Sequence, residues 1–270
     1  FVLKDTYDLY FMVNREITKE NLDDIYNSGF DSEEFKQKDP CGIVYELMKH
    51  TDNQLDIEIG ALLTAMIAWG NRKAIRSAAL TMLRDEMNWH PAHFILSHAY
   101  EQSYANAKNN CVYRTLNVDT FKQICSNIAD SLQGFSTIEE MIEGKSSKDA
   151  IAQICRMLEP AKVGTMDKSA CKRVCMYFRW MTRHQAPDMG LWKNRSEADL
   201  YAVMDVHVCD LTMSILKNKR PTWKAVVELT DIFKSWDSTD PLKYDIALLT
   251  LSDRIDEEEK IINSWGKQNR

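Results

Sequence analysis

The stretch Asp56-Ile-Glu-Ile-Gly-Ala-Leu-Leu-Thr-Ala-Met-Ile-Ala-Trp69 is the most apolar part of the chain. Its large apolar residues recur at spacings of three and four, while small residues occupy the opposite side. Such a pattern is typical of a helix that is buried over most of its surface. We therefore expect residues 56–69 to form a central helix whose main apolar side carries Ile59, Leu62, Leu63, Met66 and Ile67.

Helical patterns also dominate the sequence on both sides of this stretch. Only nine glycines and six prolines occur in 270 residues, and apolar residues seldom alternate with polar ones over a strand length. Start signals such as Asp39-Pro40 and the capping-box pattern of Ser136-Thr-Ile-Glu139 precede apolar-periodic segments. The expected helices are one that starts at Pro40, 121–132, a short one after Ser136, one capped by Ser146 or Ser147, 169–184, 206–216, 222–236, 241–251 and one from Asp256.

These helices predict an all-α fold, without internal repeats or an obvious linker. We expect a single unit over residues 1–270 that is organised as a two-lobed helical bundle. The first lobe is a barrel-like arrangement over 55–183, and the second combines 1–54 with 184–270.

Composition and cysteine usage indicate a cytoplasmic protein. No apolar run approaches the roughly 18 residues of a membrane span, and the first residues lack the pattern of a signal peptide. Seven cysteines, an odd number spread widely, favour a reducing compartment. Cys171 and Cys175 are one helical turn apart, but no second pair completes a four-ligand site. We therefore expect no metal and no cofactor; the sequence gives no indication of the oligomeric state.

Net charge varies strongly along the chain. The whole chain carries −6 with a pI near 5.6, which argues against a general nucleic-acid-binding protein. Residues 161–224, however, carry +6, from twelve Lys or Arg against six Asp or Glu, whereas 1–160 carry −8 and 225–270 carry −4. Two interpretations stay open, a solvated helix face and a surface that contacts phosphates. Between residues 161 and 184, the basic residues are Lys162, Lys168, Lys172, Arg173, Arg179 and Arg183.

Two residues of this basic segment are candidates for chemistry. Lys172 stands near the start of the 169–184 helix, at the edge of its apolar side and after a turn that contains Pro160 and Gly164. A lysine in such a place can be partly desolvated, which favours the free amine and makes it a nucleophile. Asp205 begins an apolar helix, where an aspartate is an N-cap and can also be a catalytic carboxylate. The alternatives are a surface lysine and a simple helix cap.

Several segments resemble an uncharacterised bacterial family that is common among Bacteroidetes. They are Ala65-Met-Ile-Ala-Trp-Gly-Asn-Arg-Lys73, Lys172-Arg-Val-Cys-Met-Tyr-Phe-Arg-Trp-Met-Thr-Arg183, Asp188-Met-Gly-Leu-Trp192, Met204-Asp-Val-His-Val208 and Asp240-Pro-Leu-Lys-Tyr-Asp-Ile-Ala-Leu248. The resemblance covers roughly residues 40–252. This family has no assigned activity.

A more distant resemblance concerns chemistry. Lys172, Asp205 and the Trp69-Gly70-Asn71 turn are similar in kind and order to motifs of helix-hairpin-helix DNA glycosylases, most of all the archaeal 8-oxoguanine branch. The resemblance implies double-stranded DNA as the partner, with a damaged nucleotide flipped out of the duplex. Lys172 would attack the sugar C1′, and Asp205 would accept a proton or stabilise positive charge. Trp69 and Asn71 would stack on the base and read its edge. The residues implied to contact phosphates are Arg173, Arg179 and Arg183.

The sequence departs from that glycosylase pattern in three places. Glu159-Pro-Ala-Lys-Val-Gly164 replaces the Leu-Pro-Gly-x-Gly hairpin, Asp210 stands where many glycosylases have arginine, and the four-cysteine loop of an iron–sulfur cluster is missing. Trp69 can equally be a core aromatic residue, and Asn71 a helix-stop residue. The hypothesis is a DNA glycosylase/lyase that acts on a damaged base, with oxidised purines as the class considered. The alternative is a non-catalytic helical DNA- or protein-binding protein with the same scaffold.

Overall fold

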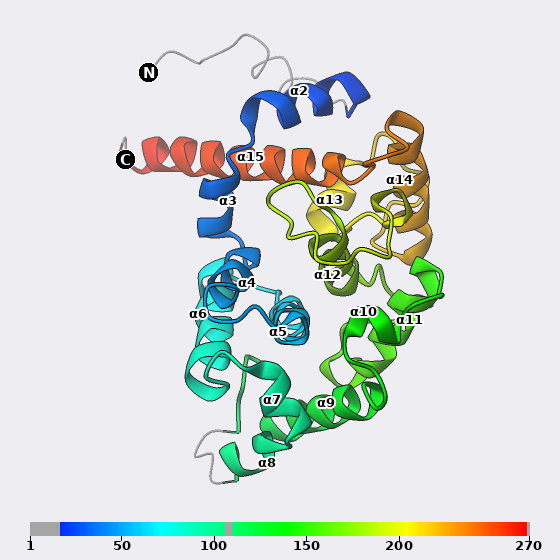
Figure 1. The fold of residues 1–270 in the computed structure, drawn as a ribbon. Coiled ribbons are helices and arrows are strands. Elements are labelled where there is room, and N and C mark those ends of the chain that lie inside the picture. Colours follow the sequence, from blue (N-terminus) through cyan, green and yellow to red (C-terminus); the bar gives the residue numbers. More distant parts are fainter. Residues whose placement is uncertain (1–16, 106–109, 269–270) are drawn as a thin grey trace.

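The computed structural model describes residues 17–105 and 110–268 (Figure 1). Within these ranges every regular element is a helix and no strand occurs, which confirms the all-α prediction. Helix α2 (Lys19–Gly29) packs along helix α15 (Lys243–Gln268), so segments far apart in the sequence lie side by side. An ion pair of 3.1 Å between the Lys243 Nζ and the Asp23 carboxylate joins the two helices.

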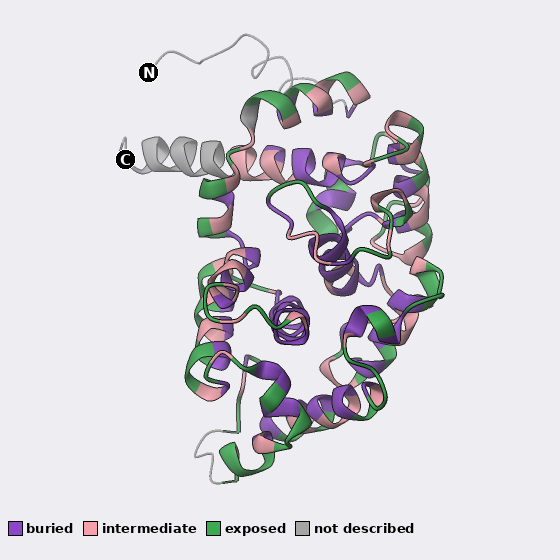
Figure 2. Ribbon diagram, viewed as in Figure 1, coloured by how far each residue is buried: buried purple, intermediate pink, exposed green. Residues whose placement is uncertain are grey.

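Helix α5 (Gln54–Met66) lies at the centre of the fold. Every residue from Leu55 to Met66 is buried (Figure 2). Helices α4 (Cys41–Leu47), α7 (Pro91–Leu96) and α12 (Lys172–Thr182) all pack against it. The close approach of α4 requires glycine at position 60, because a Cβ there would lie 2.2 Å from a methyl carbon of Leu47. The predicted central, buried helix is thus confirmed.

The other helices extend around α5 and α12 (Figure 1). From α7 the chain continues through α8 (Ala99–Ser103) and α9 (Val118–Ser131) to α11 (Ser147–Met157), which packs against both α9 and α12. The division into one lobe over 55–183 and another over 1–54 with 184–270 stays a prediction. The remaining elements are α3 (Ser32–Lys38), α6 (Arg72–Leu80), η1 (Thr81–Glu86), α10 (Ile138–Met141), η2 (Glu159–Ala161), η3 (Glu197–Asp199), α13 (Val206–Leu211) and α14 (Trp223–Trp236).

Two carboxylates of α5 are buried although the helix is apolar. Asp56 accepts a hydrogen bond of 2.8 Å from the Ala92 N–H, and Glu58 accepts one from the Ile138 N–H. Burial raises the pKa of the Glu58 carboxyl, an effect that its hydrogen bonds only partly offset. Each acid satisfies an N–H group at the start of a neighbouring helix, α7 or α10. The two carboxylates therefore fix the positions of other helices relative to α5.

Side-chain caps mark several of the predicted helix starts. The Ser146 hydroxyl accepts from the Asp149 N–H at 3.1 Å and starts α11, as predicted. The Thr222 hydroxyl caps α14 in the same way. The capping-box prediction is displaced by one residue, because Thr137 rather than Ser136 caps α10. Glu139 consequently faces the interior and is buried.

Three further boundaries differ from the sequence prediction. Helix α13 ends at Leu211, whereas the sequence predicts a helix over 206–216. Helix α12 starts at Lys172 instead of Ser169, since Cys171 has a left-handed backbone with φ of 50°. The separate helices expected over 241–251 and from Asp256 are one continuous helix, α15, because no glycine or proline interrupts the chain between them. The side chains of α15 beyond Ile255 lie outside the described residues. In the described ranges no helix combines the length and the apolar character that crossing a bilayer requires.

Candidate functional site

The candidate site begins at the first turn of α12. The Ser169 hydroxyl accepts a hydrogen bond of 3.1 Å from the Cys171 N–H, which fixes the residue just before the helix. Because Cys171 is left-handed, the chain turns sharply there, and Lys172 becomes the first helical residue. The Lys172 side chain retains 35% of its exposure, so solvent reaches part of it.

Asp205 starts helix α13 and divides its two carboxylate oxygens between two tasks. Its Oδ1 caps the helix by accepting from the Val208 N–H at 2.9 Å. Its Oδ2 accepts a hydrogen bond of 2.7 Å from the Lys172 Nζ. The structure therefore brings the two residues predicted for catalysis into direct contact, across 33 positions of sequence.

The environment keeps the Asp205 carboxyl ionised. Burial alone would raise the pKa of Asp205, but the charge of Lys172, its hydrogen bond and the Val208 N–H together lower that pKa below its ordinary value. The carboxylate is therefore negatively charged at neutral pH, beside a lysine amine.

The backbone that leads to Asp205 is held by two helices. The Ala202 N–H donates to the Thr230 hydroxyl of α14, and the Val203 N–H donates to the Asp245 carboxylate of α15, both at 2.9 Å. These bonds fix an extended segment whose side chains are largely buried. The position of Asp205 is consequently set by the core and not by a loose loop.

Arg173 connects the start of α12 to the end of α5. Its Nη1 donates to the Met66 carbonyl at 2.6 Å, and its Nη2 donates to the Lys162 carbonyl. Burial lowers the pKa of the Arg173 guanidinium. Two of its N–H groups are used inside the protein, and its role toward DNA phosphates stays a prediction.

The Trp69-Gly70-Asn71 turn follows α5 at this same end. Asn71 is exposed and caps α6, because its Oδ1 accepts from the Ala74 N–H at 3.2 Å; it starts a helix instead of stopping one. Trp69 is half-buried, and the guanidinium of Arg114 lies 4.2 Å from the centre of its ring. The roles of Trp69 and Asn71 in recognising a base stay predictions.

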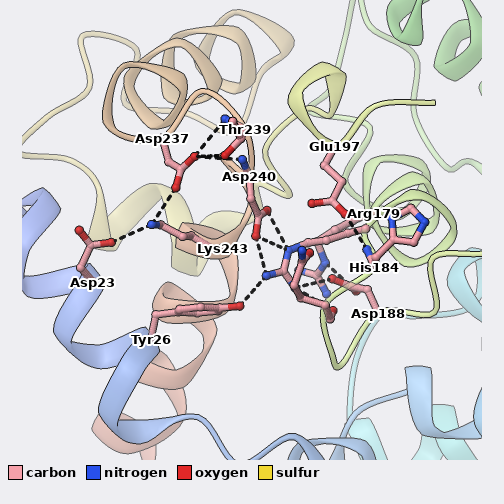
Figure 3. A network of polar contacts seen from close by, with 12 residues as sticks. Asp23, Tyr26, Arg179, His184, Asp188, Glu197, Asp237, Thr239, Asp240 and Lys243 are labelled. Atoms are coloured by element: carbon pink, nitrogen blue, oxygen red, sulfur yellow. Dashed lines mark hydrogen bonds and ion pairs between the residues drawn. The ribbon is translucent and has the colours of Figure 1, made fainter.

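The predicted phosphate contacts of Arg179 and Arg183 are wrong. The exposed fractions of these residues are 1% and 0%. The Arg179 Nε donates to Asp188 at 3.1 Å (Figure 3). The Arg183 Nε donates to Asp240 at 2.9 Å. A guanidinium group that is buried in such ion pairs cannot reach a phosphate outside the fold. Both arginines instead belong to an internal polar network.

This network joins helices from both ends of the chain. The Tyr26 hydroxyl of α2 accepts from the Arg183 Nη2 at 2.7 Å. Burial would lower the pKa of Arg183, but the Asp240 and Asp188 carboxylates hold it above its ordinary value. The network therefore has a structural function.

Several of the basic side chains in residues 161–224 are buried or partly buried. Of the six basic residues up to Arg183, only Lys162 and Lys168 are classed as exposed. Further along, the Arg195 Nη2 donates to the Ile142 carbonyl at 2.8 Å. A charge count along the sequence thus overstates the positive potential of the surface.

Other features of the described residues do not extend the candidate site. Cys171 and Cys175 are buried, and no three His, Cys, Asp or Glu side chains in ranges 17–105 and 110–255 are grouped to hold a metal ion. A cavity of about 580 Å³ lies at the start of α11 and includes Ser146, Arg195 and Tyr201. None of the predicted site residues lines this cavity.

Sequence reasoning missed Tyr113 and Arg114, which lie against the Trp69 turn. The Tyr113 hydroxyl donates to the Trp69 carbonyl at 2.8 Å. The two residues belong to no recognisable motif, and they are about 44 positions from the turn that they contact. Only the tertiary structure brings them to it.

Comparison with protein families assigns this chain to a group without a known activity. The family described as "Protein of unknown function (DUF2400)" matches residues 39–253. The chain belongs to this family. The DUF2400 match includes Lys172, Asp205 and the Trp69 turn. No curated protein and no solved structure matches the chain, so the likeness to DNA glycosylases rests on the sequence motifs alone.

Proposed function

We propose that this DUF2400 protein is a DNA base-excision repair glycosylase with lyase activity, acting on a damaged base of the oxidised-purine class. The observation that carries the proposal is the 2.7 Å contact between the Lys172 amine and the Asp205 carboxylate, both partly exposed to solvent. An amine nucleophile next to an ionised carboxylate is an arrangement that suits displacement at a sugar carbon.

Lys172 acts as the nucleophile. The ammonium group of Lys172 first loses a proton to solvent, and the neutral amine then forms a bond to C1′ of the flipped nucleotide while the glycosidic C1′–N bond breaks and its electron pair leaves with the base. One amine proton neutralises the departing base. The second moves to O4′ as the C1′–O4′ bond breaks, which opens the sugar ring and leaves a C1′=N Schiff base. Removal of a C2′ proton then expels the 3′ phosphate by β-elimination and cleaves the strand.

Asp205 stabilises the positive charge that develops on the sugar as the base departs. Its lowered pKa makes it a weak proton acceptor and a persistent anion, which favours electrostatic stabilisation over general-base catalysis. Because its other oxygen is bonded to the Val208 N–H, the charge is held in one place during the reaction.

Borohydride trapping tests the proposal. The intact protein is incubated with duplex DNA that contains 8-oxoguanine, and borohydride reduces any Schiff base to a permanent covalent adduct. We expect an adduct with the wild-type protein and none with Lys172→Gln. Lys168→Gln is the matched control, because the Lys168 side chain is 82% exposed and lies near the same helix start.

Two results would overturn the proposal. An unchanged adduct in Lys172→Gln would remove Lys172 from the mechanism. No adduct and no cleavage by the wild-type protein on a broad panel of lesions would favour a non-catalytic binding protein. In that case damaged and undamaged duplexes should bind equally, with a strong dependence on salt.

A further inference from the structure

Arg114 and Trp69 form a stacked pair beside the candidate site. The guanidinium carbon of Arg114 lies 4.2 Å from the centre of the Trp69 ring. Trp69 is half-buried and packs against the core, whereas Arg114 is exposed. Tyr113 holds the indole from its edge, with ring centres 6.0 Å apart, and bonds to the Trp69 carbonyl. The guanidinium of Arg114 is therefore exposed to solvent and lies on the ring of Trp69, which the core holds in place.

The backbone conformations at Gly70 and at Arg114 both permit this contact. Gly70 has φ of +99°, and a Cβ there would lie 2.0 Å from the Arg114 Nη1. Glycine thus leaves the space that the guanidinium occupies. Arg114 itself has φ of 52°, in a turn closed by a hydrogen bond of 2.8 Å from the Leu116 N–H to the Tyr113 carbonyl. Both segments are arranged so that Arg114 lies over Trp69.

Among the residues whose side chains the structure describes, 17–105 and 110–255, no acceptor bonds to the N–H groups of Arg114. The arginines of the nearby helix α6 and of η1 differ from it. Arg72 pairs with Asp253, Arg76 donates to backbone carbonyls, and Arg84 pairs with Asp85. Among the residues that the structure describes, the contact of Arg114 is the Trp69 ring, which leaves its hydrogen-bonding edge available.

The pair lies at the same end of α5 as the candidate site. Trp69 follows Met66 by three residues, and the Met66 carbonyl accepts a hydrogen bond from Arg173, the residue after Lys172. Exposed Lys73 adds a further positive charge at the start of α6. This edge of the site is therefore cationic, although the arginines at the far end of α12 are buried.

We infer that Arg114 binds a backbone phosphate of the DNA strand next to the reacting nucleotide, and that Trp69 is the platform that orients it. The inference rests on the proposed function. A planar guanidinium binds two phosphate oxygens at once, and stacking on an aromatic ring fixes its plane in advance. The ring face that Arg114 covers is not accessible to a base. Trp69 accordingly supports a phosphate contact in place of the base stacking suggested by the sequence.

The test is a salt titration of binding to a duplex that contains a tetrahydrofuran abasic analogue, measured by fluorescence anisotropy. Arg114→Ala is expected to weaken binding by about tenfold and to reduce the slope of log affinity against log salt by about one. Arg114→Lys should keep the slope but recover only part of the affinity, because lysine lacks the planar fork. Arg220→Ala, which removes an exposed arginine of the basic segment, is the matched control and should leave both quantities unchanged.

Trapping of the same variants distinguishes this inference from the proposed function. At saturating DNA, Arg114→Ala should give the wild-type yield of adduct, since the residue binds but does not react. Wild-type affinity and slope in Arg114→Ala would overturn the inference even if the Lys172 adduct forms. A loss of affinity in Arg114→Ala, together with no adduct in the wild-type protein, would instead overturn the catalytic proposal and support the phosphate contact.

Discussion

Lys172 and Arg179 lie seven residues apart on α12, and therefore only about 20° apart around the helix axis, but their surroundings are opposite. The side chains of Lys172 and Asp205 retain 35% and 27% of their exposure. Those of Arg179 and Asp188 retain 1% and 0%. Each pair joins a cation of α12 to an aspartate later in the chain. The pair at the start of the helix is partly exposed, whereas the pair near its end is buried.

This difference separates structural from chemical roles. A buried ion pair strongly destabilises the protein when one partner is removed, because the other charge stays buried without compensation. A half-exposed pair contributes little to folding, since water solvates both partners almost as well. The buried end of α12 is therefore explained by stability alone. The contact between Lys172 and Asp205 is not, which makes it the better candidate for function.

The largest effect should follow from breaking the buried end. Asp188→Ala leaves the charges of Arg179 and Arg183 without their shared carboxylate, and we expect it to lower the free energy of unfolding by about 3–5 kcal/mol. Urea denaturation followed by circular dichroism measures this change. Asp85→Ala, which removes half of an exposed pair with Arg84, should change stability by less than about 0.5 kcal/mol. Similar costs for the two variants would contradict the comparison.

Sequence alone could predict the helices and name Lys172 and Asp205 as candidates, but it could not show whether each charged side chain faces the solvent or the core. The apolar period of α5 and the cap at Ser146 are local signals, and local signals decide where helices form. Whether Arg179 is buried depends on Asp188, which reaches it from a loop outside the helix. That information is tertiary, so the position of Arg179 in the helix did not reveal that its side chain is buried.

The contact between Arg114 and Trp69 could not be predicted from the sequence either, because it also depends on the tertiary structure. Neither the Trp69 turn nor the Tyr113 segment shows a periodic pattern that would indicate their contact. The sequence indicated that Gly70 belongs to a turn. Its close approach to Arg114, however, depends on a segment more than 40 residues away.

The second prediction concerns the buried carboxylate of Asp245 in α15. This fully buried carboxylate accepts from the Val203 N–H, two residues before Asp205, and is influenced by the charge of Arg179. Burial raises its pKa from 3.8 to about 7, so the folded protein holds a proton that the unfolded chain releases above about pH 4. Stability should therefore fall as the pH rises, by about 2 kcal/mol between roughly pH 5 and pH 7, and then level off.

Asp245→Asn provides the check on this pH dependence. Asparagine is neutral at every pH and can still accept from the Val203 N–H, so the decrease in stability over this range should be smaller in the variant. Burial also raises the pKa of Glu86 to about 7, with the same sign, so the slope should decrease further in the double variant with Glu86→Gln. Urea midpoints at several pH values measure both effects. An undiminished slope in Asp245→Asn would show that this carboxyl is already ionised in the folded protein.

The smallest effect on folding should come from the exposed end. Lys172→Gln removes the ion pair with Asp205 but leaves the Asp205 Oδ1 as the cap of α13, and the freed oxygen is accessible to water. We expect a loss of less than about 1 kcal/mol in the same urea experiment, together with a complete loss of borohydride adduct. A loss as large as that of Asp188→Ala would make Lys172 one more structural cation of α12. A near-native stability without adduct would assign the contact between Lys172 and Asp205 to chemistry, because the fold would then have no need of it.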